Sequence, residues 1–327
     1  MGKSVMAGYE IHKGISLKMF SNNELEAIHS ASLEVLDKTG IKVESKEARD
    51  IFDGGGCIVD EKTHVVKIPN HVVEDSIRSA PSKVLMAGRT SKNDHYCSGK
   101  TIGFANFGMA VKINDPITGK QRQTTKQDVI DVTRACDAMD QTNVLVSAVS
   151  AGDVPQQVEH LHEAECFFVH SSKPVVSCSS GKYVAQKIIE MAAAVVGGKD
   201  KLRERPIYSC PVCPLSPLQL TSNVTETIIE CAKAWLPVRV LSMAMAGATT
   251  PVTLAGTLVT HNAEVLSGIV LTQLTQRGCP NVYASSSVIF DLRKGASPVG
   301  SPELALLSAA VPAIARYYNM PSWVAGG

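Results

Sequence analysis

The sequence lacks most of the features that mark large functional classes. Acidic and basic residues nearly balance at 31 and 32, and a net charge of +1 excludes a basic field for nucleic acid or anionic lipid. The first residues, MGKSVMAGYE, have no apolar core, so no secretory leader is predicted. We expect no membrane-spanning apolar run, and the nine scattered cysteines indicate buried thiols in a reducing, cytoplasmic setting.

Several catalytic motifs are also missing. No GxGxxG follows a predicted strand, and GxxxxGK[ST], HExxH and a GxSxG elbow between strand and helix are absent. Dinucleotide-binding folds, P-loop enzymes and these hydrolase classes therefore lack support. Cys210 and Cys213 have the spacing of a metal pair, but the chain has no second pair. No metal is predicted, and a zinc site is kept only as the weakest alternative.

The composition is that of a globular protein with a large core, with 44% hydrophobic and 19% charged residues. Short strands and helices alternate over residues 1–100, beginning with a capping box at Ser21 and Glu24. This part is predicted to be an N-terminal α+β region, and residues 101–327 a second domain.

From Thr101 onward, apolar strands alternate with helices. The predicted strands are Ile102–Phe107, Val144–Val149, Pro174–Cys178, Pro206–Cys210, Val238–Met243, Asn281–Ser285 and Ser322–Ala325. The predicted helices are Thr125–Met139, Gln156–His170, Tyr183–Val196, Leu220–Trp235, Pro251–Gln276 and Pro302–Tyr317. Continuously apolar strands that alternate with helices are typical of a parallel sheet. The predicted fold is α/β, a (β/α)8 TIM-type barrel that is incomplete at the C-terminus, without its last helix–strand–helix portion.

Active sites of such barrels lie at the C-terminal strand ends. Asp153 follows the second predicted strand and Asp291 the sixth, and each is a candidate general base or counter-charge. The alternative for each is a loop aspartate or a helix cap.

Aromatic and small residues complete the predicted site. Aromatics are only 5% of the chain, and Tyr283, Trp323 and Phe107 on predicted strands are candidate walls for an alkylated ammonium group. Core packing is the alternative for each one. The predicted rim consists of Ser242, Ser286, Gly326 and Gly327.

One polar cluster interrupts the most apolar predicted helix. His261, Asn262 and Glu264 lie inside the segment Pro251–Gln276. Buried polar groups need hydrogen-bond partners, so the cluster is either a packing network, which we favour, or one wall of a functional site.

Five segments together resemble the trimethylamine methyltransferase family. They are KIPNHVVEDSIRSAPSKVLMAGR, CPLSPLQL, LSMAMAGATTPVTLAGTLVTHNAEVLSGIVLTQL, KGASPVGSPELALLSAA and YYNMPSWVAGG. The resemblance implies a (β/α)8 barrel that transfers a methyl group from an amine to the Co(I) centre of a separate corrinoid protein. It implies no directly bound cofactor, because the partner supplies the corrinoid. A cytoplasmic homo-oligomer is expected, with no nucleic acid or membrane as partner.

The resemblance also gives an expectation for the end of the chain. In the trimethylamine-specific branch, a strand like PSWVAGG is followed by pyrrolysine, which an amber codon encodes. The expectation is therefore a chain truncated at that codon, and inactive in this form because the imine that would activate a tertiary amine is missing. The alternatives are a methyltransferase for quaternary amines of the glycine betaine type, or an inactive fragment that binds a corrinoid protein.

Overall fold

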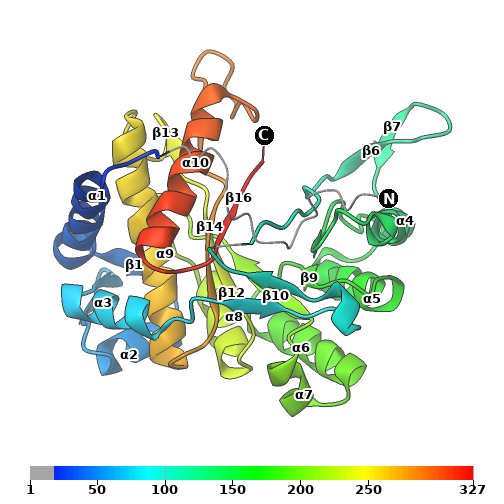
Figure 1. Ribbon diagram of the computed structural model, residues 1–327, viewed down its shortest axis with the longest axis horizontal. Coiled ribbons are helices and arrows are strands. Elements are labelled where there is room, and N and C mark those ends of the chain that lie inside the picture. Colours follow the sequence, from blue (N-terminus) through cyan, green and yellow to red (C-terminus); the bar gives the residue numbers. More distant parts are fainter. Residues whose placement is uncertain (1–17, 100, 327) are drawn as a thin grey trace. The chain divides into compact units, whose positions relative to one another are not determined.

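The computed structural model describes residues 18–99 and 101–326, which form two compact units (Figure 1). Residues 85–211 make the first unit, and residues 18–84 together with 212–326 make the second. Residues 1–17, to which the prediction about a secretory leader applies, lie outside the described residues. Lys100 and the predicted rim residue Gly327 lie outside them as well. The predicted domain division at residue 100 cuts the chain differently from these units and stays a prediction.

The first unit contains parallel strands alternating with helices. Its parallel strands are β8 (Leu145–Val146), β9 (Val175–Val176) and β10 (Tyr208–Val212). Its helices are α4 (Lys126–Ala138), α5 (Glu159–His170), α6 (Lys182–Val196) and α7 (Lys199–Glu204), with a 3-10 turn η3 (Gln156–Val158) before α5. The predicted strand and helix order is confirmed for these elements, apart from α7, which was not predicted.

The predicted strand Ile102–Phe107 is wrong as a continuous strand. This segment makes only a parallel bridge from Ala105 to Val144, with a second bridge from Ala110 to Val149 beyond it. Phe104 and Phe107 are exposed. A strand needs a continuous ladder of backbone pairs, and these isolated bridges do not supply one.

Other strands are short elements that pair in two-stranded sheets of their own. They are β4 (Val84–Met86), β5 (His95–Cys97), the hairpin β6 (Lys112–Asn114) with β7 (Gln121–Gln123), β13 (Met245–Ala246) and β15 (Val288–Ile289). A 3-10 turn η2 (Ser91–Asn93) precedes β5.

The second unit is built around helix α9 (Leu254–Thr275), which lies against parallel strands (Figure 1). The strands are β12 (Val238–Ser242), β14 (Asn281–Ser285) and β16 (Ser322–Val324), in this order. Helices α8 (Ser222–Lys233) and α10 (Pro302–Tyr317) also belong to this unit. A Cβ on Gly268 would lie 2.7 Å from Val240 Cγ1, so this glycine allows α9 to approach β12 closely.

The N-terminal helices of the second unit pack on α9 as well. They are α1 (Asn22–Glu34), α2 (Lys46–Gly54) and α3 (Asn70–Ser79), together with the wide turn η1 (Val35–Thr39). The strands between these helices are β1 (Ile41–Val43), β2 (Ile58–Asp60) and β3 (Val65–Lys67). Strand β1 pairs with β3 and with β11 (Gln219–Leu220). The capping box predicted at Ser21 and Glu24 is present and opens α1.

Helix α9 corrects one expectation drawn from composition. Its 22 residues are long and apolar enough to cross a membrane, so the expectation of no such run is wrong by that test. However, 72% of the apolar window is buried inside the protein. A helix that is apolar all round is equally typical of the core of a large domain, which is where α9 lies.

Candidate active site at the ends of β12, β14 and β16

The register of the three strands aligns their C-terminal ends. Ser242 pairs with Ser285, and Ser285 pairs with Val324. Because side chains alternate along a strand, these residues share the sheet face that α9 covers. Residues one position earlier, such as Trp323, share the opposite face.

Glu264 of α9 connects the covered face to a neighbouring loop. Its Oε2 accepts a hydrogen bond from Ser242 Oγ at 2.7 Å, and its Oε1 accepts from Ser216 Oγ at 2.5 Å and from Leu218 N at 3.0 Å. Burial raises the pKa of this carboxyl, while the three donors oppose the rise. Glu264 therefore holds the end of β12 and the 216–218 loop in one arrangement.

His261 lies one turn before Glu264 and is fully buried. Its Nδ1 lies 3.2 Å from Ser287 Oγ, and its ring meets the Tyr283 ring edge to face at a centroid distance of 5.4 Å. Its Nε2 has no hydrogen-bond partner in residues 18–99 and 101–326. Burial lowers the pKa of His261 to about 3, so the imidazole is neutral at physiological pH.

Arg239 and Trp323 form a stacked pair on the opposite sheet face. The guanidinium carbon lies 3.7 Å from the centroid of the Trp323 ring, and Arg239 is only 1% exposed. A desolvated guanidinium over an indole is a strong cation–π contact. Trp323 was predicted as a wall for a cationic ligand, and one face of its ring already carries this cation.

Tyr283 belongs to a buried hydrogen-bonded chain. Its hydroxyl donates to Asn262 Oδ1 at 2.8 Å, and Asn262 Nδ2 donates to Tyr318 Oη at 2.8 Å. Burial raises the pKa of the Tyr283 hydroxyl well above its ordinary value. The residue is fully buried, so its side chain supports β14 and offers no exposed ring surface.

The other predicted residues of this unit have structural partners or open surroundings. Asp291 Oδ1 accepts from the backbone nitrogens of Arg293 and Lys294, an arrangement that closes a turn. The backbone nitrogen of Ser286 donates to Ser242 O at 3.0 Å. A Cβ on Gly326 would meet no atom within 4 Å, so the end of β16 is open.

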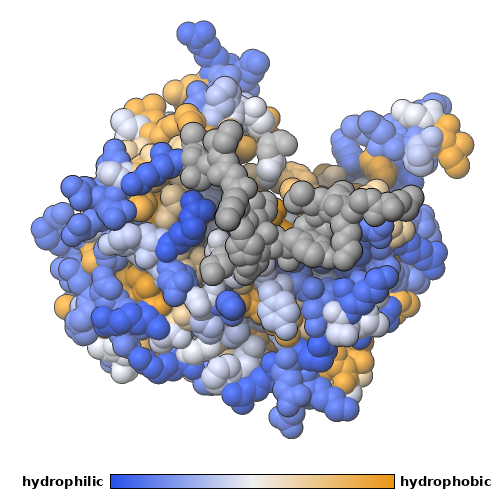
Figure 2. Space-filling model, in the orientation of Figure 1, coloured by the Kyte–Doolittle hydropathy of each residue, from blue (hydrophilic) through white to orange (hydrophobic). Residues whose placement is uncertain are grey.

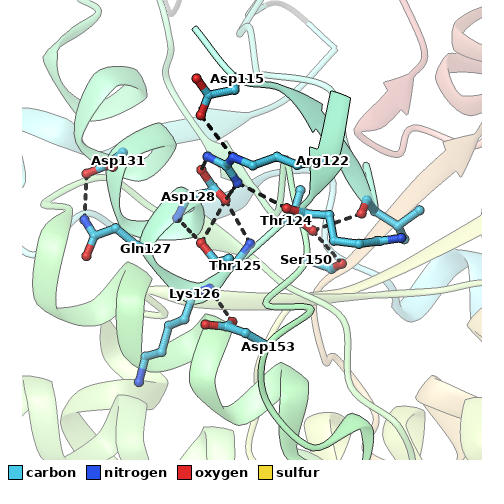
Figure 3. A network of polar contacts seen from close by, with 12 residues as sticks. Asp115, Arg122, Thr124, Thr125, Lys126, Gln127, Asp128, Asp131, Ser150 and Asp153 are labelled. Carbon is cyan, nitrogen blue, oxygen red and sulfur yellow. Dashed lines mark hydrogen bonds and ion pairs between the residues drawn. The ribbon is translucent and has the colours of Figure 1, made fainter. Parts of the chain in front are cut away.

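Asp153 and Phe107 belong to the first unit. Asp153 Oδ1 accepts from Lys126 N, the first residue of α4, at 2.6 Å (Figure 3). This carboxylate thus caps the positive end of a helix. Phe107 is 67% exposed. The structure therefore brings Ser242, Ser286, Tyr283 and Trp323 into one unit and gives both aspartates backbone partners; their predicted catalytic roles stay predictions.

All nine cysteines are free thiols, and no group of His, Cys, Asp or Glu suited to a metal occurs among the described residues.

Sequence reasoning missed Arg239. The only signal is a single charge in the otherwise apolar strand Val238–Ser242, and a buried charge in such a strand needs a reason. The cluster of His261, Asn262 and Glu264 on α9 is a hydrogen-bonded network, as the packing interpretation predicts.

Parallel strands that alternate with helices define an α/β protein. In this one, small hydroxyl residues stand at the aligned strand ends. A family model described as trimethylamine methyltransferase (MTTB) matches residues 4–327, and the chain belongs to that family. The solved structure of the monomethylamine methyltransferase (MtmB) of Methanosarcina barkeri shares this α/β fold, with a TM-score of 0.54, 13% identity, and coverage of 93% of this chain and 67% of that one.

Two relatives carry the name trimethylamine methyltransferase MttB. The Desulfitobacterium hafniense protein is 53% identical over 99% of this chain and 65% of its own length. The Methanosarcina thermophila protein is 43% identical over 99% of this chain and 68% of its own length. A glycine betaine methyltransferase of Desulfitobacterium hafniense is 31% identical over 94% of this chain and 64% of its own length. The chain thus spans about two thirds of the length of these relatives.

Proposed function

We propose that this chain is part of a methyltransferase that moves a methyl group from trimethylamine to a corrinoid carried by a separate protein. The observation that carries the proposal is the difference in similarity among relatives. Identity is 53% to a protein named trimethylamine methyltransferase and 31% to one named glycine betaine methyltransferase. The proposed substrate is therefore trimethylamine. A quaternary amine is the alternative substrate that the experiment below also tests.

In this proposal, the strands of both units belong to one (β/α)8 barrel, and the chemistry takes place at the C-terminal ends of β12, β14 and β16. The residues there fit a large planar partner group. Ser242, Ser285 and Ser286 are small, and the space around Gly326 is open. When bound, the corrinoid supplies the cobalt nucleophile that accepts the methyl group.

The chain's own residues bind and orient the amine in this proposal. Trp323 offers the part of its ring that Arg239 leaves uncovered as a wall for methyl groups. Phe107 offers exposed ring surface, and Tyr283 supports β14 from beneath. Asp153 and Asp291 are proposed to accept the proton that trimethylamine carries in its protonated form. Each carboxylate must first release the backbone N–H groups that now donate to it. Glu264 and His261 position the strand ends.

The test is methyl transfer by the complete product of the gene. Protein, Co(I) corrinoid protein and trimethylamine are mixed without oxygen, and the visible absorbance of Co(I) is followed. Trimethylamine should convert the Co(I) signal to that of methyl-Co(III), whereas glycine betaine should leave it unchanged. Methyl transfer from glycine betaine alone would reverse the substrate assignment, and binding of the corrinoid protein without transfer from either amine would indicate the inactive alternative.

The expected pyrrolysine after Gly327 stays a prediction. It is checked by the nucleotide sequence that follows the Gly327 codon, where an in-frame TAG with continued coding is expected. The homo-oligomeric state and the cytoplasmic location are proposals of the same standing.

A further inference from the structure

A surface cleft of about 410 Å³ lies in the second unit, where α1, α3 and the end of α10 meet. Its chemistry comes from His29 of α1, Glu74 and Arg78 of α3, and Tyr317 of α10. We infer that this cleft binds a small zwitterion that carries an alkylated ammonium group and a carboxylate. None of the strand-end residues described above lines it, so it is a second site that does not depend on the proposed methyl transfer.

The ammonium end of such a ligand matches Glu74 and Tyr317. The Glu74 side chain is 40% exposed, and Tyr317 is 43% exposed. The Tyr317 ring is held by the Tyr318 ring at a centroid distance of 5.4 Å and by the His29 ring at 5.8 Å. A carboxylate beside a fixed aromatic ring attracts a cation that has no hydrogen to donate, through charge and through the ring quadrupole.

The carboxylate end matches Arg78. Arg78 follows Glu74 by one helical turn on α3, so both side chains leave the same face of the helix. Residues at this spacing often pair with each other, yet no ion pair joins Glu74 to Arg78 in the described parts of the chain. Glu74 and Arg78 thus line one cleft with opposite charges about 6 Å apart along the helix axis, an arrangement that complements a zwitterion of a few heavy atoms.

A buried hydrogen-bonded chain fixes Glu74 before any ligand arrives. Asn262 Nδ2 donates to Tyr318 Oη, so the Tyr318 hydrogen is directed to His29 Nδ1, 2.9 Å away. His29 then carries its own hydrogen on Nε2 and donates it to Glu74 Oε1 at 2.7 Å. Among the described residues, no hydrogen-bond partner occupies the second oxygen of Glu74, so that oxygen is available to the cleft. A carboxylate held in place in this way loses little freedom on binding, which favours affinity.

The surroundings of the cleft agree with a polar ligand. Hydrophilic side chains dominate the visible face over α2 and α3 (Figure 2). A second cleft of the same unit, of about 530 Å³, carries Lys46, Glu47, Asp50 and Lys233 and no aromatic side chain. It provides a control with charge but without a ring.

The experiment is calorimetric titration of the complete product of the gene with glycine betaine as the probe. Saturable binding is expected, about tenfold weaker for tetramethylammonium, which lacks the carboxylate, and for acetate, which lacks the ammonium group. Glu74→Gln and Arg78→Met should each weaken glycine betaine binding about tenfold. The amide introduced by Glu74→Gln keeps an oxygen acceptor for His29, so the buried chain survives. Glu47→Gln, in the cleft without a ring, should leave binding unchanged.

Trp323→Leu separates this cleft from the strand ends, because it alters the proposed methyl-transfer site alone and should not change the titration. Absence of saturable binding, or equal binding to Glu74→Gln and the unaltered chain, would overturn the inference. Tetramethylammonium binding as tightly as glycine betaine would overturn the zwitterion and leave a simple cation site. Loss of binding in Trp323→Leu alone would assign the ligand to the strand ends instead.

Discussion

The two units hold their bonded carboxylates in different surroundings. In the first unit, Asp128 accepts two hydrogen bonds from the Arg122 guanidinium, at 2.7 and 2.8 Å, and Arg122 is 39% exposed (Figure 3). In the second unit, Glu264 is buried and accepts only from two serine hydroxyls and one backbone amide among the described residues. One carboxylate is paired with a cation near water, and the other is surrounded by neutral donors in the core.

This difference reverses the direction of the pKa change. The Arg122 guanidinium holds the pKa of Asp128 well below its ordinary value, and a backbone hydrogen bond from Thr118, together with Arg122, lowers the pKa of Asp115 to about 2. Burial raises the pKa of Glu264. A charged partner thus stabilises ionisation, whereas three neutral donors do not fully replace the lost water.

The largest expected effect comes from removing the buried carboxylate. Glu264→Ala should lower the free energy of unfolding by about 3–5 kcal/mol, because the buried Ser242 hydroxyl and the half-buried donors of Ser216 and Leu218 lose their acceptor and a cavity opens. Urea unfolding followed by circular dichroism measures it. Glu264→Gln is the matched control, since its amide oxygen keeps part of the network, and should cost less.

The pH dependence of the unfolding free energy, compared between the unaltered chain and Glu264→Gln, tests the raised pKa of Glu264 directly. The folded-state pKa of Glu264 lies above its unfolded value, so ionised Glu264 destabilises the fold at neutral pH. Relative to Glu264→Gln, the unaltered chain should gain stability as the pH falls from above the folded pKa toward about 4.5. A difference between the two chains that does not change with pH would contradict the raised pKa.

A second, smaller effect concerns His261 in the same core. Its folded pKa of about 3 lies below the ordinary value of 6.5, so the unfolded chain takes up a proton that the folded chain refuses. Stability should therefore fall as the pH drops below 6.5, by about 2 kcal/mol between pH 7 and pH 5. His261→Asn keeps a donor for Ser287 and does not titrate, so its unfolding free energy should fall less over this range. Parallel pH profiles for the two chains would show that His261 is not buried and neutral.

The contrast between the units also separates what the sequence could predict from what it could not. Helix starts were predictable because their signals are local, as with the capping residues Ser21 and Glu24 and the proline at the first position of α10. The order of the main parallel strands along the chain followed from their apolar runs, with the exception of Ile102–Phe107. The partner of a polar residue depends on the distant segments that the fold brings to it, so the contacts of Glu264 with Ser216 and of Arg239 with Trp323 could not be predicted. The hairpin of β6 and β7 was missed because its residues are polar and mostly exposed.

The smallest expected effect belongs to the first unit. Asp128→Asn removes the charge that pairs with Arg122 but keeps a side-chain oxygen for the start of α4. After allowance for solvent screening, the loss in unfolding free energy is expected to be about 1 kcal/mol or less at pH 7. The folded pKa of Asp128 is depressed, so its stabilisation is present above the unfolded value near 3.8 and is lost as the pH falls through the folded value. The difference between the two chains should therefore shrink below about pH 4, and should also shrink in high salt, whereas the Glu264 effect should be insensitive to salt because that carboxylate is shielded from solvent. Equal salt sensitivity of the two effects would show that the exposed Arg122 does not set Asp128 apart from Glu264, and would remove the contrast between the units.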